Sequence, residues 1–172
     1  MRAVERAAVG HDAELTELYE RHSLWAVRFG YMLTGEREIA EDVVQDAFLR
    51  TFDRLTSMRN RDAFPGYLRM TILNGVKAYF RRRKSEGLSL RRQAILVGPT
   101  HAPSAEVEER EHLWQALQRL PYRQRAALVL RYYEDLSEQD AARSLGTTVA
   151  GMKALVSRAK ARLRTQLRED DR

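Results

Sequence analysis

Apolar side chains recur at the three- and four-residue spacing of amphipathic helices over most of this chain. The first such stretch predicts a helix over residues 12–33, which ends at Thr34-Gly35. A second helix is predicted over residues 36–55. The apolar positions of the first stretch are Leu15, Leu18, Tyr19, Trp25, Phe29 and Leu33.

A third helix is predicted over residues 64–84, after a polar loop at 56–62. Pro65 falls in its first turn, where a missing backbone N–H costs least. The helical period is then lost over residues 85–104, which contain two glycines, two prolines and three serines. This composition predicts a flexible linker between two parts of the chain.

After the linker the helical period returns. A helix over residues 106–120 has acids in its first turns, where they suit the positive end of the helix dipole. Pro121 begins another helix that reaches residue 133. A short helix capped by Ser137 and a longer one over residues 148–168 complete the pattern.

The last two helices have the features of a helix-turn-helix. Ser137 with Asp140 three residues later forms a capping box, and Gly146 permits a sharp turn. The second helix has an apolar seam at Met152, Leu155, Val156, Ala159 and Leu163. Its outward positions hold Lys153, Arg158, Lys160, Arg162 and Arg164. This pattern favours a helix that enters the major groove while cations hold phosphates, with an ordinary helical hairpin as the alternative.

No stretch alternates between apolar and polar residues as a strand would. We therefore predict an all-α protein with two small helical domains joined by a flexible linker. The C-terminal domain contains the helix-turn-helix. The domain boundaries predicted in this way are residues 1–84, 85–104 for the linker, and 105–172.

The amino-acid composition excludes several classes of protein. With 44% hydrophobic and 31% charged residues, the 172-residue chain can build a core. The absence of cysteine excludes a disulfide framework, a Cys-ligated zinc site and a thiol nucleophile. The longest apolar run has five residues, so we expect no membrane insertion and no signal peptide. The expectation is a soluble protein of a reducing compartment.

The net charge of +6 is unevenly distributed along the chain. Residues 61–100 carry a net +7 and residues 137–168 a net +5, whereas residues 1–60 carry −3. Two basic blocks about sixty residues apart indicate two contacts with one polyanion. Two solvated helix faces are the alternative.

The basic third helix combines cations with aromatic residues. Tyr67 and Phe80 follow the apolar period, so core packing is favoured for them. Four consecutive cations repel one another, which favours a bound polyanion over a solvated tail. The polar positions of this helix are Arg69, Asn74, Lys77, Arg81, Arg82, Arg83 and Lys84.

No catalytic or metal-binding pattern is present. The four histidines lack metal-ligand spacing, and no phosphate-binding glycine motif or nucleophile elbow occurs. The acids at Glu41, Asp42 and Asp46 are better explained as the polar face of a helix than as a metal or acid–base set. We predict no cofactor and no enzyme activity, and we expect this acidic face to meet solvent or a protein.

Four motifs in order resemble the extracytoplasmic-function (ECF) group of bacterial sigma factors in the sigma-70 family, most closely a subgroup common in actinobacteria. They are A-E-D-V-V-Q-D-A-F at 40–48, F-P-G-Y-L-R-M-T-I-L-N at 64–74 followed by R-R-R-K, L-P-Y-R-Q-R-A-A-L-V-L-R-Y-Y-E-D-L-S at 120–137, and the helix-turn-helix. The resemblance covers residues 12–168. It implies a cytoplasmic, non-enzymatic promoter-recognition subunit of RNA polymerase.

The resemblance also implies roles for individual residues. Contacts with the β′ clamp helices of core polymerase fall on Asp42, Gln45, Asp46 and Phe48. The residues implied to contact the promoter −10 element are Arg59, Asn60, Arg69, Asn74, Lys77, Arg81, Arg82, Arg83 and Lys84. A base flipped out of the DNA is implied to bind near Asn74. The residues implied to contact the −35 element are Thr147, Thr148, Ala150, Gly151, Lys153, Ala154, Ser157, Arg158 and Lys160. The polymerase β flap and an anti-sigma factor are further partners that the family implies.

The chain departs from the family pattern at two places. Gly151-Met152 stands where a Thr-Val pair is common, and Ala78 stands where an Asp is usual. We expect the first to weaken −35 binding without changing the fold. The competing hypotheses are a two-domain helix-turn-helix regulator that binds duplex DNA without polymerase, and a helical adaptor that binds no nucleic acid.

Overall fold

The computed structural model describes residues 2–55, 60–85 and 105–170, with side chains for 13–55, 60–85 and 109–169. These ranges are helical and contain no strand, so the all-α prediction is confirmed. All but the first residue of the predicted linker lies outside the described residues.

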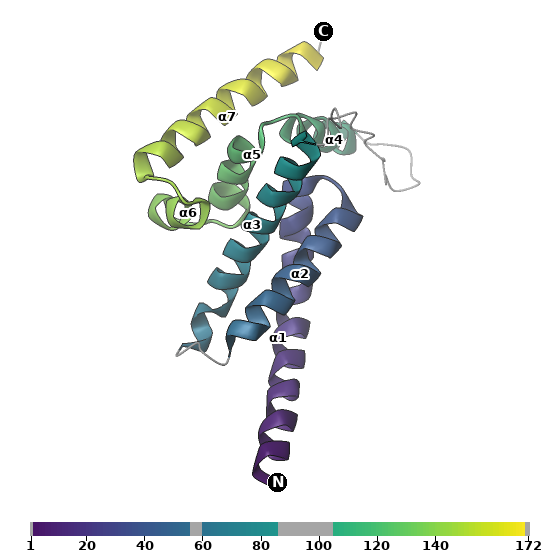
Figure 1. The fold of residues 1–172 in the computed structure, drawn as a ribbon. Helices are drawn as coiled ribbons and strands as arrows, with labels where there is room; N and C mark the ends of the chain where they lie inside the picture. Colours follow the sequence, from purple (N-terminus) through teal and green to yellow (C-terminus); the bar gives the residue numbers. More distant parts are fainter. Residues whose placement is uncertain (1, 56–59, 86–104, 171–172) are drawn as a thin grey trace.

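Three long helices form the N-terminal group. They are α1 (Arg2–Thr34), α2 (Arg37–Leu55) and α3 (Phe64–Ser85), with a single 3-10 turn, η1 (Arg61–Ala63), leading into α3. Figure 1 shows that the first half of α1 extends beyond the other helices. This helix begins ten residues before the predicted start, because its first turns are rich in good helix formers such as alanine, glutamate and arginine.

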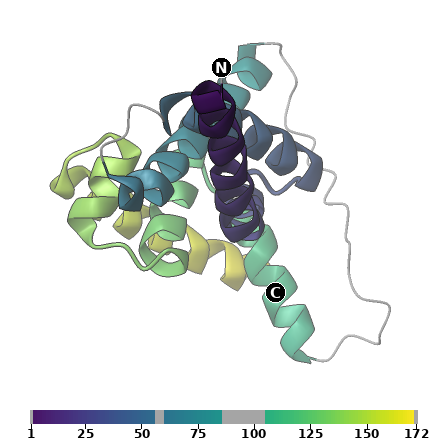
Figure 2. The same ribbon diagram turned by 90° about the horizontal axis from the view of Figure 1, so that it is seen from below.

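Four α-helices and one π-helical turn form the C-terminal group. They are α4 (Ala105–Gln118), α5 (Tyr122–Leu128), the π turn η2 (Val129–Tyr133), α6 (Glu138–Leu145) and α7 (Val149–Asp170). In Figure 2, α6 and α7 lie together to one side of α1. The predicted helix over residues 121–133 is thus an α-helix that widens into a π turn.

The caps of the predicted helix-turn-helix are present. The Ser137 hydroxyl accepts the Asp140 N–H at 3.0 Å and donates to the Asp140 carboxylate at 2.6 Å. Gly146 ends α6 in the left-handed region, at φ 62° and ψ 49°. The Thr147 N–H then donates to the Ala142 carbonyl at 2.9 Å, which closes the turn before α7.

A cluster of aromatic rings fills the core of the N-terminal group. The Phe48 ring is 2% exposed and lies 5.0 Å from the Tyr19 ring and 5.5 Å from the Phe52 ring, centre to centre. Phe52 stacks on Phe64 at 6.0 Å. The Phe48 ring is therefore enclosed by its own helices in this structure, and its contact with polymerase stays a prediction.

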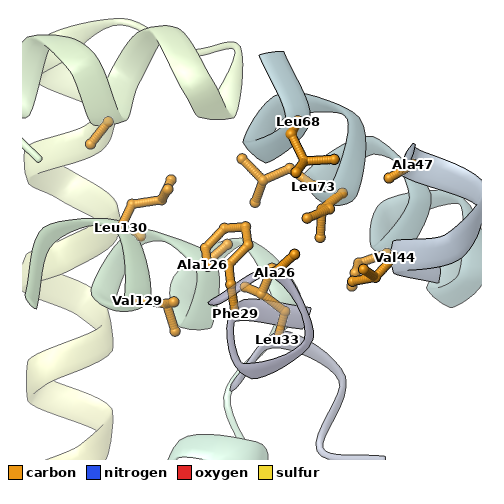
Figure 3. Close-up of a cluster of buried hydrophobic side chains, with 14 of the residues drawn as sticks. Ala26, Phe29, Leu33, Val44, Ala47, Leu68, Leu73, Ala126, Val129 and Leu130 are labelled. Carbon is orange, nitrogen blue, oxygen red and sulfur yellow. The ribbon is translucent and has the colours of Figure 1, made fainter. Parts of the chain in front are cut away.

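The two helical groups share one continuous core, and the sequence pattern did not predict this contact. Phe29 of α1 lies between Ala126 and Val129 on one side and the α2 and α3 side chains on the other (Figure 3). The Tyr122 hydroxyl of α5 donates to the Leu73 carbonyl of α3 at 2.8 Å. Hydrophobic periodicity shows which face of a helix is buried but not which element covers it.

Polar contacts fix the corner between α4 and α5 against the first group. Gln118 donates to the Met32 carbonyl at 3.2 Å, and its own carbonyl and amide oxygens accept hydrogen bonds from Arg125. Arg125 is buried with its guanidinium 5.2 Å from the Phe80 ring centre. Trp114 of α4 stacks on Tyr31 of α1 at 4.7 Å. The two groups are thus joined by polar as well as apolar contacts.

We predict that folding stability falls as the pH is lowered through the range where His22 titrates. Burial and, second, the Arg21 charge lower the pKa of His22 from its ordinary 6.5. The unfolded chain therefore takes up this proton at a higher pH than the folded chain. The stability that the neutral ring provides is complete above pH 6.5 and is lost as the pH falls through the folded pKa.

Urea unfolding between pH 7.5 and 5 measures this effect. The variant His22→Gln should show a flatter decline than the wild type, whereas His112→Gln, at an exposed position on α4, should follow the wild type. Equal slopes for His22→Gln and the wild type would contradict the prediction.

Candidate nucleic-acid and polymerase interfaces

The helix α7 has a buried seam and an exposed polar face, as predicted. Met152 and Ala159 are fully buried, and Leu155 nearly so. The positions on the other face are exposed, and they are Ala150, Lys153, Ala154, Ser157, Arg158 and Lys160. The structure therefore brings most of the predicted −35 residues together on one surface of α7.

Two threonines shape the start of this surface. Thr148 accepts the Gly151 N–H on its hydroxyl at 3.0 Å and so caps the first turn of α7. A Cβ at Gly151 would lie 2.5 Å from the Thr147 hydroxyl oxygen and 3.2 Å from that of Thr148. Because Gly151 has no Cβ, both threonine hydroxyls can lie against the first turn of α7. This close approach is a local structural reason for a glycine where the family pattern has another residue.

Among the residues that the structure describes, the cations of the α7 surface make weak contacts. Lys153 pairs with Glu138 at 3.2 Å, with both side chains well exposed. Arg158 donates to the Ala154 carbonyl at 3.2 Å, and the Lys160 ammonium lies 4.6 Å from the Tyr132 ring centre. Exposed pairs of this kind contribute at most about 1 kcal/mol, so these cations are available to phosphates.

The basic helix α3 divides into exposed and paired cations. Arg69 is 17% exposed and donates to the Glu134 carboxylate at 2.8 Å. Arg83 pairs with Glu36 at 2.8 Å and also bonds the Tyr79 hydroxyl. The remaining predicted residues of α3 are exposed, and they are Asn74, Lys77, Arg81, Arg82 and Lys84. The four-cation run therefore does not act as a unit, because Arg83 turns toward α2.

The loop before α3 contributes one described residue to the predicted −10 set. Asn60 is exposed, and its side-chain oxygen accepts the Asp62 N–H at 2.9 Å, which caps η1. Arg59 lies outside the described residues. A local capping bond therefore places Asn60 near the N-terminal end of α3, which is the end farther from Lys84.

A hollow of about 150 Å³ lies between the two helical groups. Asn74 and Lys77 of α3 line one side, and Arg123 of α5 and Arg143 of α6 line the other. The predicted site for a flipped base near Asn74 is therefore bordered by the C-terminal group in this arrangement.

The acidic helix α2 presents one exposed face. Asp42, Gln45 and Asp46 are exposed at helical spacing, and Leu49 continues the same face with 59% exposure. Sequence reasoning missed Leu49 because Phe48 is the larger apolar residue of the motif. The signal that could have identified Leu49 is spacing: positions 42, 45, 46 and 49 share a face, whereas position 48 points elsewhere.

In the part of the chain that the structure describes, no three His, Asp or Glu side chains are placed to hold a metal ion. No helix in those same ranges has the length and apolar character needed to cross a bilayer.

Comparison with known protein families gives two matches, in order. The family described as Sigma-70 region 2 matches residues 18–86, and the family described as Sigma-70, region 4 matches residues 110–163. The first match spans α2 and α3, and the second spans the helix-turn-helix.

Individual relatives agree with these matches. The chain is 30% identical over 128 residues to an RNA polymerase sigma-E factor of Streptomyces coelicolor, covering 74% of this chain and 71% of that protein. It is 31% identical over 147 residues to the ECF RNA polymerase sigma factor SigM of Mycobacterium tuberculosis, covering 86% and 74%. The fold is similar to that of the sigma factor RpoE in a complex with the anti-sigma factor NepR from Bartonella quintana, with a TM-score of 0.72, 23% identity, and coverage of 90% and 97%.

We predict that Thr148→Ala destabilises the chain by about 1 kcal/mol, because the capping bond to the Gly151 N–H is lost. Thr165→Ala is the control. Thr165 lies inside α7 with its hydroxyl on the Ala161 carbonyl, and alanine is a better helix former, so its effect should be near zero or stabilising. Chemical unfolding followed by circular dichroism measures both, and equal losses would contradict the capping role.

Proposed function

Because the chain belongs to the ECF group of sigma-70 RNA polymerase sigma factors, we propose that its two exposed interfaces perform the two tasks of such a subunit. The chain binds core polymerase and directs promoter-specific initiation through the −10 and −35 elements. The observation that carries this proposal is the pairing, in one chain, of an acidic exposed α2 face with a basic exposed helix-turn-helix. Such a chain is an initiation factor without enzyme activity of its own, and its place of action is the cytoplasm.

The proposed functions are assigned to the predicted domains. Residues 1–84 bind core polymerase and the −10 element, residues 85–104 connect, and residues 105–172 bind the −35 element and the β flap. Support comes from the two family matches, which fall on either side of residues 87–109.

The α2 face is the proposed contact with the β′ clamp helices. Asp42, Gln45 and Asp46 are exposed acids and an amide, and such a face repels DNA but attracts cationic residues of a protein. Leu49, rather than Phe48, supplies the exposed apolar residue at this contact. Phe48 supports the face from below, because its ring packs in the core.

The α7 surface is the proposed −35 reader. Its polar start at Thr147 and Thr148 faces base edges, and Lys153, Arg158 and Lys160 hold phosphates. Five exposed side chains of α3 can contact the −10 element without any rearrangement, and they are Asn74, Lys77, Arg81, Arg82 and Lys84. Arg69 and Arg83 join them only when their pairs with Glu134 and Glu36 are released.

An anti-sigma factor is a further proposed partner. The solved relative from Bartonella quintana is in complex with one, and its fold resembles that of this chain over 90% of the length. A protein that covers the α2 face would prevent docking on polymerase.

The alternative function is a regulator that binds duplex DNA without polymerase. The deciding experiment adds purified core polymerase from a Streptomyces to genomic DNA of the source organism, with and without the chain, and locates RNA 5′ ends. Discrete start sites that require the chain support the sigma function. Binding of the chain alone to a duplex, with no binding to core polymerase and no start sites, would establish the regulator instead.

We predict that the double variant Asp42→Ala, Gln45→Ala weakens binding to core polymerase by at least about tenfold, because two central polar contacts of the interface are removed. Helix content by circular dichroism should not change, since both side chains are exposed. Glu20→Ala, an exposed acid on α1, is the matched control and should bind normally. A loss of helix content in the double variant would assign these residues a structural role.

We predict that Arg158→Ala lowers the salt dependence of binding to a duplex with a located −35 element. Each lost phosphate contact reduces the slope of log K against log salt by about 0.9. Arg168→Ala, near the far end of α7, should leave the slope unchanged. An unchanged slope for Arg158→Ala would remove this residue from the interface.

A further inference from the structure

Three helices meet around a small hollow between the two helical groups. α6 packs against α3, and α5 packs against both of them (Figure 1). The hollow has a volume of about 150 Å³ and is lined by one cation from each helix: Lys77, Arg123 and Arg143. Its lining includes no acid in the ranges that the structure describes. We name it the three-cation hollow.

The positive charge of the three-cation hollow is largely uncompensated. Lys77 and Arg123 are exposed, and neither forms an ion pair with a residue that the structure describes. Arg143 bonds the Asp140 carboxylate through one nitrogen, Nη2, which leaves most of the N–H donors of its guanidinium for another acceptor. Because like charges repel, and because a cleft lined by one sign of charge concentrates counter-ions, this arrangement favours a bound anion.

Neutral groups of the lining suit the same anion. Asn74 lies one turn before Lys77 on α3 and is exposed, so its side-chain amide can donate a hydrogen bond beside the Lys77 ammonium. The Tyr122 hydroxyl is already used, because it donates to the Leu73 carbonyl at 2.8 Å. Burial raises the pKa of Tyr122, so its ring stays neutral and adds no negative charge to the lining.

The size of the hollow and its donors indicate the chemical class of the anion. A volume of about 150 Å³ equals that of about five water molecules, whereas pockets for whole drug-sized ligands have about 300–1,000 Å³. The hollow therefore admits a compact group rather than a whole cofactor. A terminal phosphate has a charge of about −1.5 to −2 and three acceptor oxygens, which matches donors that approach from three helices. Arginine and lysine are common partners of such groups.

We propose that the three-cation hollow binds the terminal phosphate or pyrophosphate group of a small molecule such as a nucleoside diphosphate, with the rest of the molecule outside the hollow. A phosphate of the DNA backbone carries a single charge and continues into the strand on both sides, so it matches three converging cations less well. Asn74 and Lys77 are also proposed −10 contacts, whereas Arg123 and Arg143 belong to this site alone. Arg123 therefore separates the two kinds of binding in an experiment.

Isothermal titration calorimetry of the full chain with inorganic pyrophosphate, at constant ionic strength, tests this site. We expect saturable binding at one site per chain. Arg123→Gln should weaken this binding by at least about tenfold, because a charge-assisted hydrogen bond is lost. Arg168→Gln is the matched control: it removes the same charge from an exposed position of α7 outside the hollow and should bind pyrophosphate as the wild type does.

Lys77→Gln tests the opposite side of the hollow. We expect it to weaken pyrophosphate binding by a similar factor, because the ligand is held by both helical groups. A ligand that binds the folded chain raises its Tm, and this rise should shrink in Lys77→Gln and Arg123→Gln together with the affinity. Both side chains are exposed, so both variants should keep the helix content of the wild type in circular dichroism.

A DNA duplex without terminal phosphates distinguishes the DNA backbone from a small molecule as the source of the phosphate. Arg123→Gln should bind this duplex as the wild type does. Weaker duplex binding with unchanged pyrophosphate binding would overturn the proposal, because Arg123 would then serve the DNA backbone. The absence of saturable pyrophosphate binding, or equal losses in Arg123→Gln and Arg168→Gln, would overturn it as well.

Discussion

The burial of Phe29 between two groups of helices is the contact on which the arrangement of this chain depends. Its ring is fully buried, with α5 and η2 side chains on one side and α2 and α3 side chains on the other (Figure 3). Neither group alone would enclose this ring. The two groups therefore form one core, and that core positions the exposed surfaces of α2, α3 and α7 relative to one another.

Around this shared core, positive and negative side chains are separated onto different helices. Exposed cations lie on α3 and α7, and exposed acids lie on α2. Where the helices meet, two arginines of α3 are neutralised by acids from other elements, Arg69 by Glu134 and Arg83 by Glu36. Packing thus pairs part of the basic surface of α3 with acids of the same chain.

Helix positions, the helix-turn-helix and the family were predictable from the sequence, because each is encoded locally. The Ser137 cap, the Gly146 turn and the Met152 seam require only neighbouring residues, and the structure confirms them. The contact between the groups, the inward turn of Arg69 and the burial of Phe48 were not predictable. Each depends on which distant element covers a given face, as with the 65 residues that separate Arg69 from Glu134.

Small-angle X-ray scattering of the free chain measures whether the two helical groups stay packed together in solution. A compact chain of 172 residues has a radius of gyration of about 16 Å, and the projecting start of α1 raises this value. If the two groups stay packed as in the structure, we expect a radius near that size and a distance distribution with one maximum. A clearly larger radius with two maxima, as for two separate bodies, would contradict it.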